Sequence, residues 1–237
     1  EILSGRTQDV NLQTIAKFLA PLGVQVAEAR VVADVPTAII EAVNALRQRY
    51  DYVFTTGGVG PTHDDKTADA IAEAFGVSIG VRADARAILE AHYGLDKLND
   101  ARLKMARIPD GATLIANPVS RAPGFQMENV FVMAGVPSIM RGMLEDVGPR
   151  LKGGAVVRSH TVRAKGIREG MIAQALEVLE ESSPAVAFGS YPWFSPDGYG
   201  LHLVARSADA AALEKAGADL AKLIREAGAE PEVVTTD

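Results

Sequence analysis

The chain has 237 residues, of which 48% are hydrophobic and 23% charged, a composition typical of globular proteins with a proper core. Its formal net charge of −6 argues against nucleic acid as the main partner, because nucleic-acid-binding domains usually carry a basic footprint. The absence of cysteine excludes disulfides and thiolate chemistry and favours a cytoplasmic location. The first residues do not resemble a signal peptide and no apolar run approaches a membrane span, so we expect no membrane partner.

The first two-thirds of the chain predicts helices that alternate with short apolar strands. Asn11 is placed to cap the first helix and Asp34 the second. The strand at 52–56 carries no charge, as strands buried on both faces do. In chain order the expected elements are helices at 12–22, from 34, at 66–75, 84–93, 96–107 and 137–151, and strands at 24–32, 52–56, 112–116 and 130–134. This order predicts an α/β fold in three layers, a mostly parallel sheet with helices on both faces.

A break at Lys152-Gly153-Gly154 suggests two domains, 1–152 and 155–237. The second part predicts strands at 155–164, 185–191, 200–205 and 232–234, and helices at 167–179 and 208–227. That order is βαββαβ, a small α+β domain. Tyr191-Pro192-Trp193-Phe194 is expected in a loop, where its aromatic side chains fill a small core or an interface, or bind a partner or a base.

A glycine-rich turn, Gly57-Gly58-Val59-Gly60, follows the buried strand and precedes a helix. Glycine permits positive φ and close approach of a ligand to the backbone. Successive N–H groups and a helix N-terminus form an anion site, at the sheet edge where α/β proteins bind ligands. The same turn is also compatible with a purely structural connection.

Three carboxylates lie at the helix entrance, Asp64, Asp65 and Asp69. Ordinary capping of a helix N-terminus is one explanation. However, an acidic pair beside an anion site repels a bare phosphate. A divalent metal such as Mg²⁺ or Mn²⁺, or a donor-rich group such as a pterin ring or a ribose, resolves the conflict. His63 is a candidate ligand, general base or solvated turn residue.

Two common phosphate motifs are excluded here. The Gly-Lys-Ser/Thr of a P-loop is missing, and the third glycine of the dinucleotide fingerprint has no match.

The segment Thr56–Asp69 resembles the signature of the MoaB/Mog molybdopterin-binding domain, and more closely its version in the competence/damage-inducible protein A (CinA) family. Three further segments resemble the family in order and spacing: Glu1–Asn11, Asn117–Phe125 and Ala134–Ser138, where Ala134 replaces the usual proline. The βαββαβ remainder is similar to the small second domain of CinA-type proteins. The family's first strand, which ends in Gly-Asp, and its amide-hydrolysing third domain have no match, so amidase activity is not expected.

The resemblance implies functions for individual residues. Asp65 matches an aspartate important for activity and Asp34 a second acid, so these two are the expected catalytic residues; an N-cap is the other explanation for Asp34. Lys66 or Arg121 is the expected basic contact, with Ser120 and Thr7 as further polar candidates. Metal ligands are expected at Asp64, Asp65 and Glu1. The expected ligand-binding residues are Thr56, Gly57, Gly58, Gly60, Pro61, Thr62, Asp64, Asp69, Ser4, Gly5, Asn11, Asn117, Gly135 and Pro137.

Three functions fit this site. In the CinA-type branch, the pocket is implied to split the pyrophosphate of ADP-ribose with Mg²⁺, Mn²⁺ or Co²⁺. Alternatively, the chain binds molybdopterin without turnover, or is a regulatory module that has lost the chemistry. The expected partner is a nucleotide or pterin phosphate, and the resemblance implies a homodimer or higher homo-oligomer.

Overall fold

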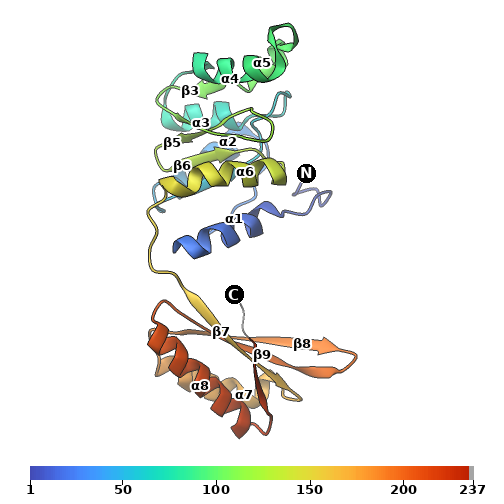
Figure 1. Ribbon diagram of the computed structural model, residues 1–237, viewed down its shortest axis with the longest axis vertical. Helices are drawn as coiled ribbons and strands as arrows, with labels where there is room; N and C mark the ends of the chain where they lie inside the picture. Colours follow the sequence, from blue (N-terminus) through green and yellow to red (C-terminus); the bar gives the residue numbers. More distant parts are fainter. Residues whose placement is uncertain (235–237) are drawn as a thin grey trace. The chain divides into compact units, whose positions relative to one another are not determined.

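A computed structural model of the chain describes residues 1–234 and contains two compact units, Glu1–Gly153 and Gly154–Asp237 (Figure 1). In the first unit the helices are α1 (Asn11–Leu19), η1 (Ala20–Leu22), α2 (Pro36–Arg47), α3 (Thr67–Phe75), α4 (Ala83–Tyr93), η2 (Leu95–Lys97), α5 (Asp100–Lys104), α6 (Pro137–Val147) and η3 (Gly148–Arg150). The strands are β1 (Val53–Thr56), β2 (Ile79–Val81), β3 (Arg107–Pro109), β4 (Thr113–Ile115), β5 (Gly124–Met127) and β6 (Val130–Met133).

The main sheet has the order β1-β6-β5-β4, and helices cover both of its faces. Side chains of β6 alternate between two cores. Val130 and Val132 pack with α2, α3 and α4, whereas Phe131 and Met133 pack with α1 and α6. All four residues of β6 are buried, as expected for a strand between two helical layers. The three-layer α/β class is therefore confirmed.

Strand direction differs from the expected mostly parallel sheet. Only β1 and β6 pair in parallel among the described residues, whereas β5 pairs antiparallel with both β6 and β4. The reason lies in the connections, because β5 and β6 are separated by two residues, Glu128 and Asn129. A parallel pair needs a crossover of about a dozen residues or more, so this short connection allows only a hairpin.

The strand expected at 24–32 is wrong. The segment has no regular secondary structure, and Val26, Val31 and Val32 are exposed. Its β-branched residues favour an extended chain, but a strand also needs a neighbour to complete its hydrogen bonds. No strand within residues 1–234 pairs with this segment.

The continuous helix expected at 96–107 is also wrong. The region forms η2 and the short helix α5, whose N-cap Asn99 accepts a hydrogen bond from the amide of Arg102. The chain then enters β3, which pairs antiparallel with β2. The interruption lies at Leu98 and Asn99, whose backbone is not helical, and Asn99 begins a new helix because asparagine is a favoured N-cap.

The second unit has the predicted order β7 (Arg158–Lys165), α7 (Glu169–Glu181), β8 (Ala187–Ser195), β9 (Gly198–Ser207), α8 (Ala210–Glu226) and β10 (Pro231–Val234). Its sheet has the order β10-β7-β9-β8, with every pair antiparallel. Core residues from α7 and α8 pack against inward side chains such as Val162 and Leu203. Asp209 caps α8 by accepting hydrogen bonds from the amides of Ala211 and Ala212.

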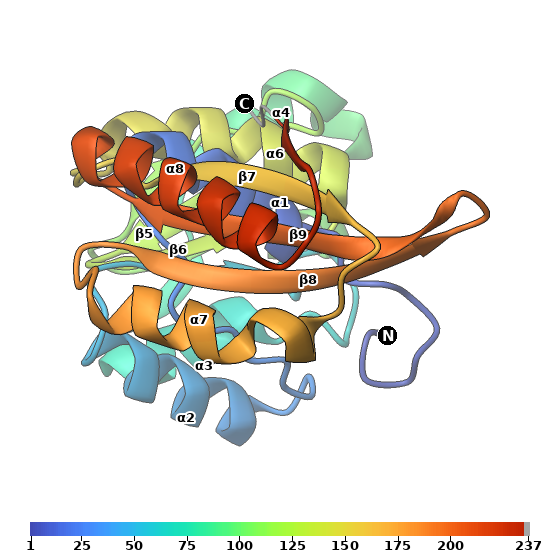
Figure 2. The ribbon, with the colours of Figure 1, turned by 90° about the horizontal axis from the view of Figure 1, so that it is seen from below.

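The aromatic segment expected in a loop belongs instead to strand β8, which Figure 2 shows extending with β9 beyond the helices of this unit. Pro192 is tolerated because β8 is an edge strand. The indole of Trp193 lies under the Arg163 guanidinium, 4.2 Å from the ring centroid. Phe194 is 83% exposed, so the segment is part sheet surface and part exposed hairpin.

Among residues 1–234, no helix has both the length and the apolar character needed to cross a membrane.

Candidate functional site

The glycine turn Gly57–Gly60 begins directly after β1. Gly57 and Gly58 have φ values of 99° and 67°, which L side chains rarely adopt. A Cβ on Gly58 would overlap the Thr67 side chain at the start of α3, so the turn is pressed against that helix. Within residues 1–234 the amides of Gly58, Val59 and Gly60 donate no hydrogen bond. Unbonded amides in a row, next to a helix N-terminus, are the type of backbone that binds anions in other proteins.

The acid pair Asp64 and Asp65 is organised by one threonine. The hydroxyl of Thr62 lies 2.5 Å from Oδ1 of Asp64 and 2.6 Å from Oδ2 of Asp65. The backbone amide of Thr62 also donates to Oδ2 of Asp65 at 2.8 Å. A hydroxyl has a single proton, so it can satisfy only one of the two carboxylates at a time. The turn therefore holds two anionic oxygens close together.

The Thr62 hydroxyl, followed by a backbone amide and the nearby charges of His63 and Lys104, lowers the pKa of Asp64 below its ordinary value. Asp64 therefore stays ionised at a lower pH than an ordinary aspartate. We expect Thr62→Val to raise this pKa, because its largest cause is removed. A carboxyl-carbon NMR titration measures the shift, with Thr113→Val at an exposed strand position as the control. An unchanged Asp64 pKa in Thr62→Val would contradict the geometry.

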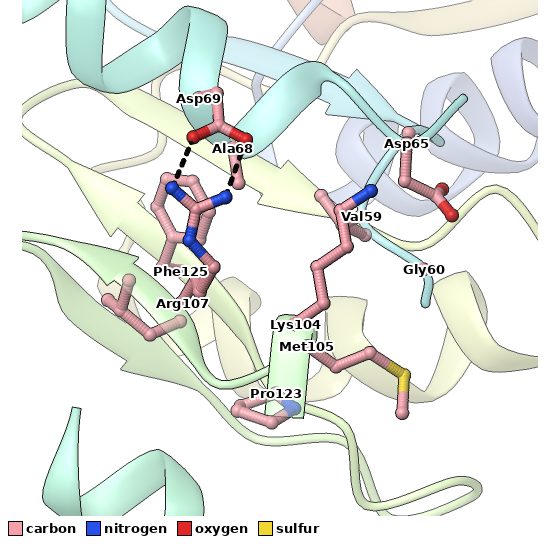
Figure 3. Close-up of a pocket in the computed structure, with 12 residues that line it drawn as sticks. Val59, Gly60, Asp65, Ala68, Asp69, Lys104, Met105, Arg107, Pro123 and Phe125 are labelled. Atoms are coloured by element: carbon pink, nitrogen blue, oxygen red, sulfur yellow. Dashed lines mark hydrogen bonds and ion pairs between the residues drawn. The ribbon is translucent and has the colours of Figure 1, made fainter. Parts of the chain in front are cut away.

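A pocket opens beside the turn (Figure 3). Gly58, Val59, Gly60 and Asp65 form one side and Ala68 and Asp69 of α3 another. The remaining lining residues are Lys104, Met105, Arg107, Ile108, Pro123 and Phe125. The pocket thus lies between the carboxyl end of β1, the segment that runs from the end of α5 into β3, and the start of β5.

Two cations line the pocket, and they differ in their partners. Arg107 binds Asp69 with two hydrogen bonds, from Nη1 to Oδ2 at 2.9 Å and from Nη2 to Oδ1 at 2.6 Å (Figure 3). This bidentate geometry is the strong form of a guanidinium–carboxylate contact. The Arg107 guanidinium therefore balances the charge of Asp69, an expected ligand-binding residue.

Lys104 instead donates from Nζ to the backbone carbonyl of Thr62. Within residues 1–234 its ammonium forms no ion pair with a carboxylate. The contact joins positions 42 residues apart in the sequence and ties α5 to the turn that carries the acid pair.

The remaining predicted segments approach the site through Gly135. A Cβ on Gly135 would lie 3.1 Å from the Cα of Gly57, so the two turns touch. Asn11 does not cap α1 as expected: it lies inside the helix, is 8% exposed, and donates from Nδ2 to the carbonyl of Gly135 at 2.7 Å. Asp9 instead accepts from the amides of Asn11 and Leu12. Asn11 therefore fixes the start of α1 beside the two glycine turns.

Of the expected site residues, the pocket brings together Gly58, Gly60, Asp65 and Asp69. Thr62 and Asp64 adjoin it through Asp65. The other expected residues do not line it: Thr56, Gly57, Pro61, Glu1, Ser4, Gly5, Asn11, Asp34, Asn117, Gly135 and Pro137.

Several of these have other structural settings. Asp34 is exposed before α2, which begins without a side-chain cap, so the capping expected of it is wrong. Asn117 is buried and donates to Ser120 and Ala122 while accepting from the amides of Val119 and Ser120. Asn117 therefore organises its own loop.

Ser4 donates to the carbonyl of Glu1 in an exposed segment. Pro137 begins α6, and Pro61 is exposed in the turn.

The sequence analysis missed Lys104 and Arg107, and favoured the exposed residues Lys66 and Arg121 as basic contacts. Both missed residues lie in the region expected as one helix at 96–107. Asn99 was the available signal, since asparagine favours an N-cap and hence a helix start inside that region. Nothing in local spacing shows that this region lies opposite the glycine turn.

The residues present fit a divalent cation on one side of the pocket. Carboxylate oxygens suit Mg²⁺ or Mn²⁺, and the single proton of the Thr62 hydroxyl can satisfy only one of the two carboxylates at a time. Within the described residues no group of three or more His, Cys, Asp or Glu side chains is arranged to hold a metal. The chain would therefore supply only Asp64 and Asp65. Mg²⁺ commonly binds through one or two carboxylates, several waters and substrate phosphate.

Comparison with known proteins agrees with this fold. Residues 1–153 match the family described as probable molybdopterin binding domain, and residues 157–233 match the middle domain of FAD synthase. The chain is thus a protein with a molybdopterin-binding type of domain followed by a small α+β domain.

Relatives define the family more closely. A CinA-like protein of Gemmatimonas aurantiaca is 35% identical over 95% of this chain, which spans 56% of that relative's length. A protein of Aeropyrum pernix is 35% identical over 94% of this chain and 87% of its own length. The crystal structure of the protein CinA, of unknown function, from Thermoplasma acidophilum is 36% identical with a TM-score of 0.60, covering 63% of this chain and 91% of its own. The chain belongs to the CinA family.

Proposed function

We propose that the chain binds a phosphorylated nucleotide or pterin in the pocket beside the glycine turn, and that it hydrolyses the pyrophosphate of ADP-ribose-like substrates with a divalent metal. One observation carries the proposal: three unbonded backbone amides and a pair of carboxylates lie at the same turn, at the carboxyl end of a buried strand. Donors for a phosphate and acceptors for a cation therefore meet in one place.

Different residues at the pocket are assigned to the phosphate, the metal and the apolar part of the ligand. The amides of Gly58, Val59 and Gly60 are placed to donate to phosphate oxygens. Asp65 lines the pocket and is held by the amide and hydroxyl of Thr62. Asp64 and Asp65 would hold the metal, which when bound supplies charge neutralisation and polarises a phosphoryl oxygen. Val59, Met105, Ile108 and Phe125 provide the apolar surface that excludes water.

The proposed reaction balances without an oxidant or a further co-reactant. Water adds to one phosphorus atom, the bridging P–O bond breaks, and AMP and ribose 5-phosphate are released. The incoming water loses its proton to solvent or to a carboxylate of the acid pair.

The decisive experiment incubates the protein with ADP-ribose and Mg²⁺, Mn²⁺ or Co²⁺ and measures AMP by chromatography. AMP formation that stops on chelation of the metal is the expected result. No AMP with any of the three metals would remove the hydrolytic part of the proposal.

A second candidate function is binding of molybdopterin without turnover, favoured by the family match over residues 1–153. A pterin phosphate should then change its fluorescence on binding without being consumed. An unchanged signal at millimolar pterin would count against this function. The homo-oligomer implied by the family resemblance stays a prediction for light scattering to test.

A further inference from the structure

Lys104 is the cation in the pocket that forms no ion pair with a carboxylate within residues 1–234, although its charge lies near Asp64. Arg107 is engaged by both oxygens of Asp69, so that pair is close to neutral. Lys104 contacts a neutral carbonyl, and within residues 1–234 it has no carboxylate partner. An ammonium carries three donors, and one is used by Thr62. Two donors of the ammonium therefore remain for a ligand.

The position of this ammonium is set by the same turn that offers the free amides. Its partner, the carbonyl of Thr62, also accepts from the amide of Asp65 at 3.4 Å, so the contact holds Lys104 at the acid pair. Lys104 and the amide-bearing residues Gly58, Val59 and Gly60 line one pocket. A phosphate bound by those amides would thus have the Lys104 ammonium in the same cavity.

We propose that Lys104 is the phosphate-recognising side chain of this site, so that the pocket selects ligands with a phosphate over the matching nucleosides. This inference rests on the proposed ligand-binding function and names the residue that discriminates between ligands. Lys66 and Arg121, the basic residues favoured by sequence alone, are exposed and do not line the pocket.

The carbonyl contact suits this function. A backbone carbonyl is a weaker partner for an ammonium than a phosphate is, because only the second carries a charge. The free protein therefore keeps Lys104 positioned at modest energetic cost, and a ligand phosphate can replace or share its donors. Asp69 is instead engaged by Arg107 through both of its oxygens, so its charge is already paired with another cation.

The test compares AMP with adenosine as calorimetric probes of the intact chain, in buffer with and without Mg²⁺. We expect Lys104→Gln to weaken AMP binding roughly tenfold or more, the loss typical of a hydrogen bond to a charged group. Adenosine binding should stay the same, since it offers no phosphate. Lys104→Arg should retain most of the AMP affinity because the charge is kept. Lys97→Gln, at an exposed position of η2 on the same segment, is the matched control and should behave as wild type.

Each other outcome decides the question. Equal AMP affinity in wild type and Lys104→Gln would overturn the inference, as would a parallel loss of AMP and adenosine binding, which would show that Lys104 only braces the turn. The proposed hydrolysis fails separately: wild-type protein that binds AMP through Lys104 but makes no AMP from ADP-ribose would keep this assignment. Wild-type protein that binds neither AMP nor inorganic pyrophosphate at millimolar concentration would overturn both.

Discussion

We expect Asp65→Asn to reduce the rate of AMP formation from ADP-ribose roughly 100-fold or more, a loss typical of removing one preorganised electrostatic group from an active site. Asp65 is the member of the acid pair that lines the pocket. Its Oδ2 accepts from the amide of Thr62 and lies 2.6 Å from the Thr62 hydroxyl, and these contacts fix the direction of the carboxylate. Asparagine has nearly the same shape but no charge, so it removes the anion and keeps an acceptor for the turn.

The companion variant for this prediction is Asp64→Asn, which removes the charge of the other proposed metal ligand. Asp64 is exposed and does not line the pocket, so we expect a smaller loss of rate. Melting curves of both variants should match the wild type, because the amide oxygen of asparagine can accept from Thr62. If Asp65→Asn kept its activity within about threefold of an active wild-type enzyme, the chemistry would have to lie elsewhere in the chain.

The second large effect is expected for Gly58→Ala, on stability and on ligand binding together. The new methyl group would overlap the side chain of Thr67 and lie 3.3 Å from its backbone nitrogen, at a φ of +67°. Strain at positive φ costs about 1–3 kcal/mol, and overpacking costs a similar amount. We therefore expect urea unfolding to show a loss of roughly 2–4 kcal/mol, and calorimetry to show loss of AMP binding as the turn shifts.

Two companion variants separate these causes. Gly111 has a φ of +82°, and no atom lies within 4 Å of the place that an alanine methyl group would take there, so Gly111→Ala should show the cost of φ alone. In a Thr67→Ala background, Gly58→Ala should cost less, because the overlapping hydroxyl is gone; neighbouring sites couple by about 0.5–3 kcal/mol. A Gly58→Ala loss no larger than that of Gly111→Ala would show that the turn is not pressed against α3.

Much of the fold could be predicted because it depends on local patterns. Apolar spacing and β-branched runs located helices α2, α3, α6, α7 and α8 and strands β1 and β6, and the order βαββαβ in the second unit is confirmed. The segment 24–32 shows the limit of such patterns. Its residues favour extended chain, but pairing depends on a neighbouring strand, and periodicity carries no information about neighbours.

The same distinction applies to the candidate site. The glycine turn Gly57–Gly60 and the acid pair Asp64 and Asp65 are contiguous in the sequence, so their proximity could be predicted from it. The contact of Asn11 with Gly135 spans 124 residues. That contact, and the meeting of Gly57 with Gly135, depend on how α1 and α6 pack on one face of the sheet.

The sequence by itself therefore determined the glycine turn, its acids and the CinA family to which the chain belongs. Only the tertiary structure decided which cations face that turn. Arg107 is neutralised by Asp69 across 38 residues, and Lys104 reaches Thr62 across 42. The physical reason is that φ preference and helix capping act over a few residues. The pocket side that carries Lys104 and Arg107 is instead positioned by the pairing of β2 with β3 and by the packing of α3 against both strands.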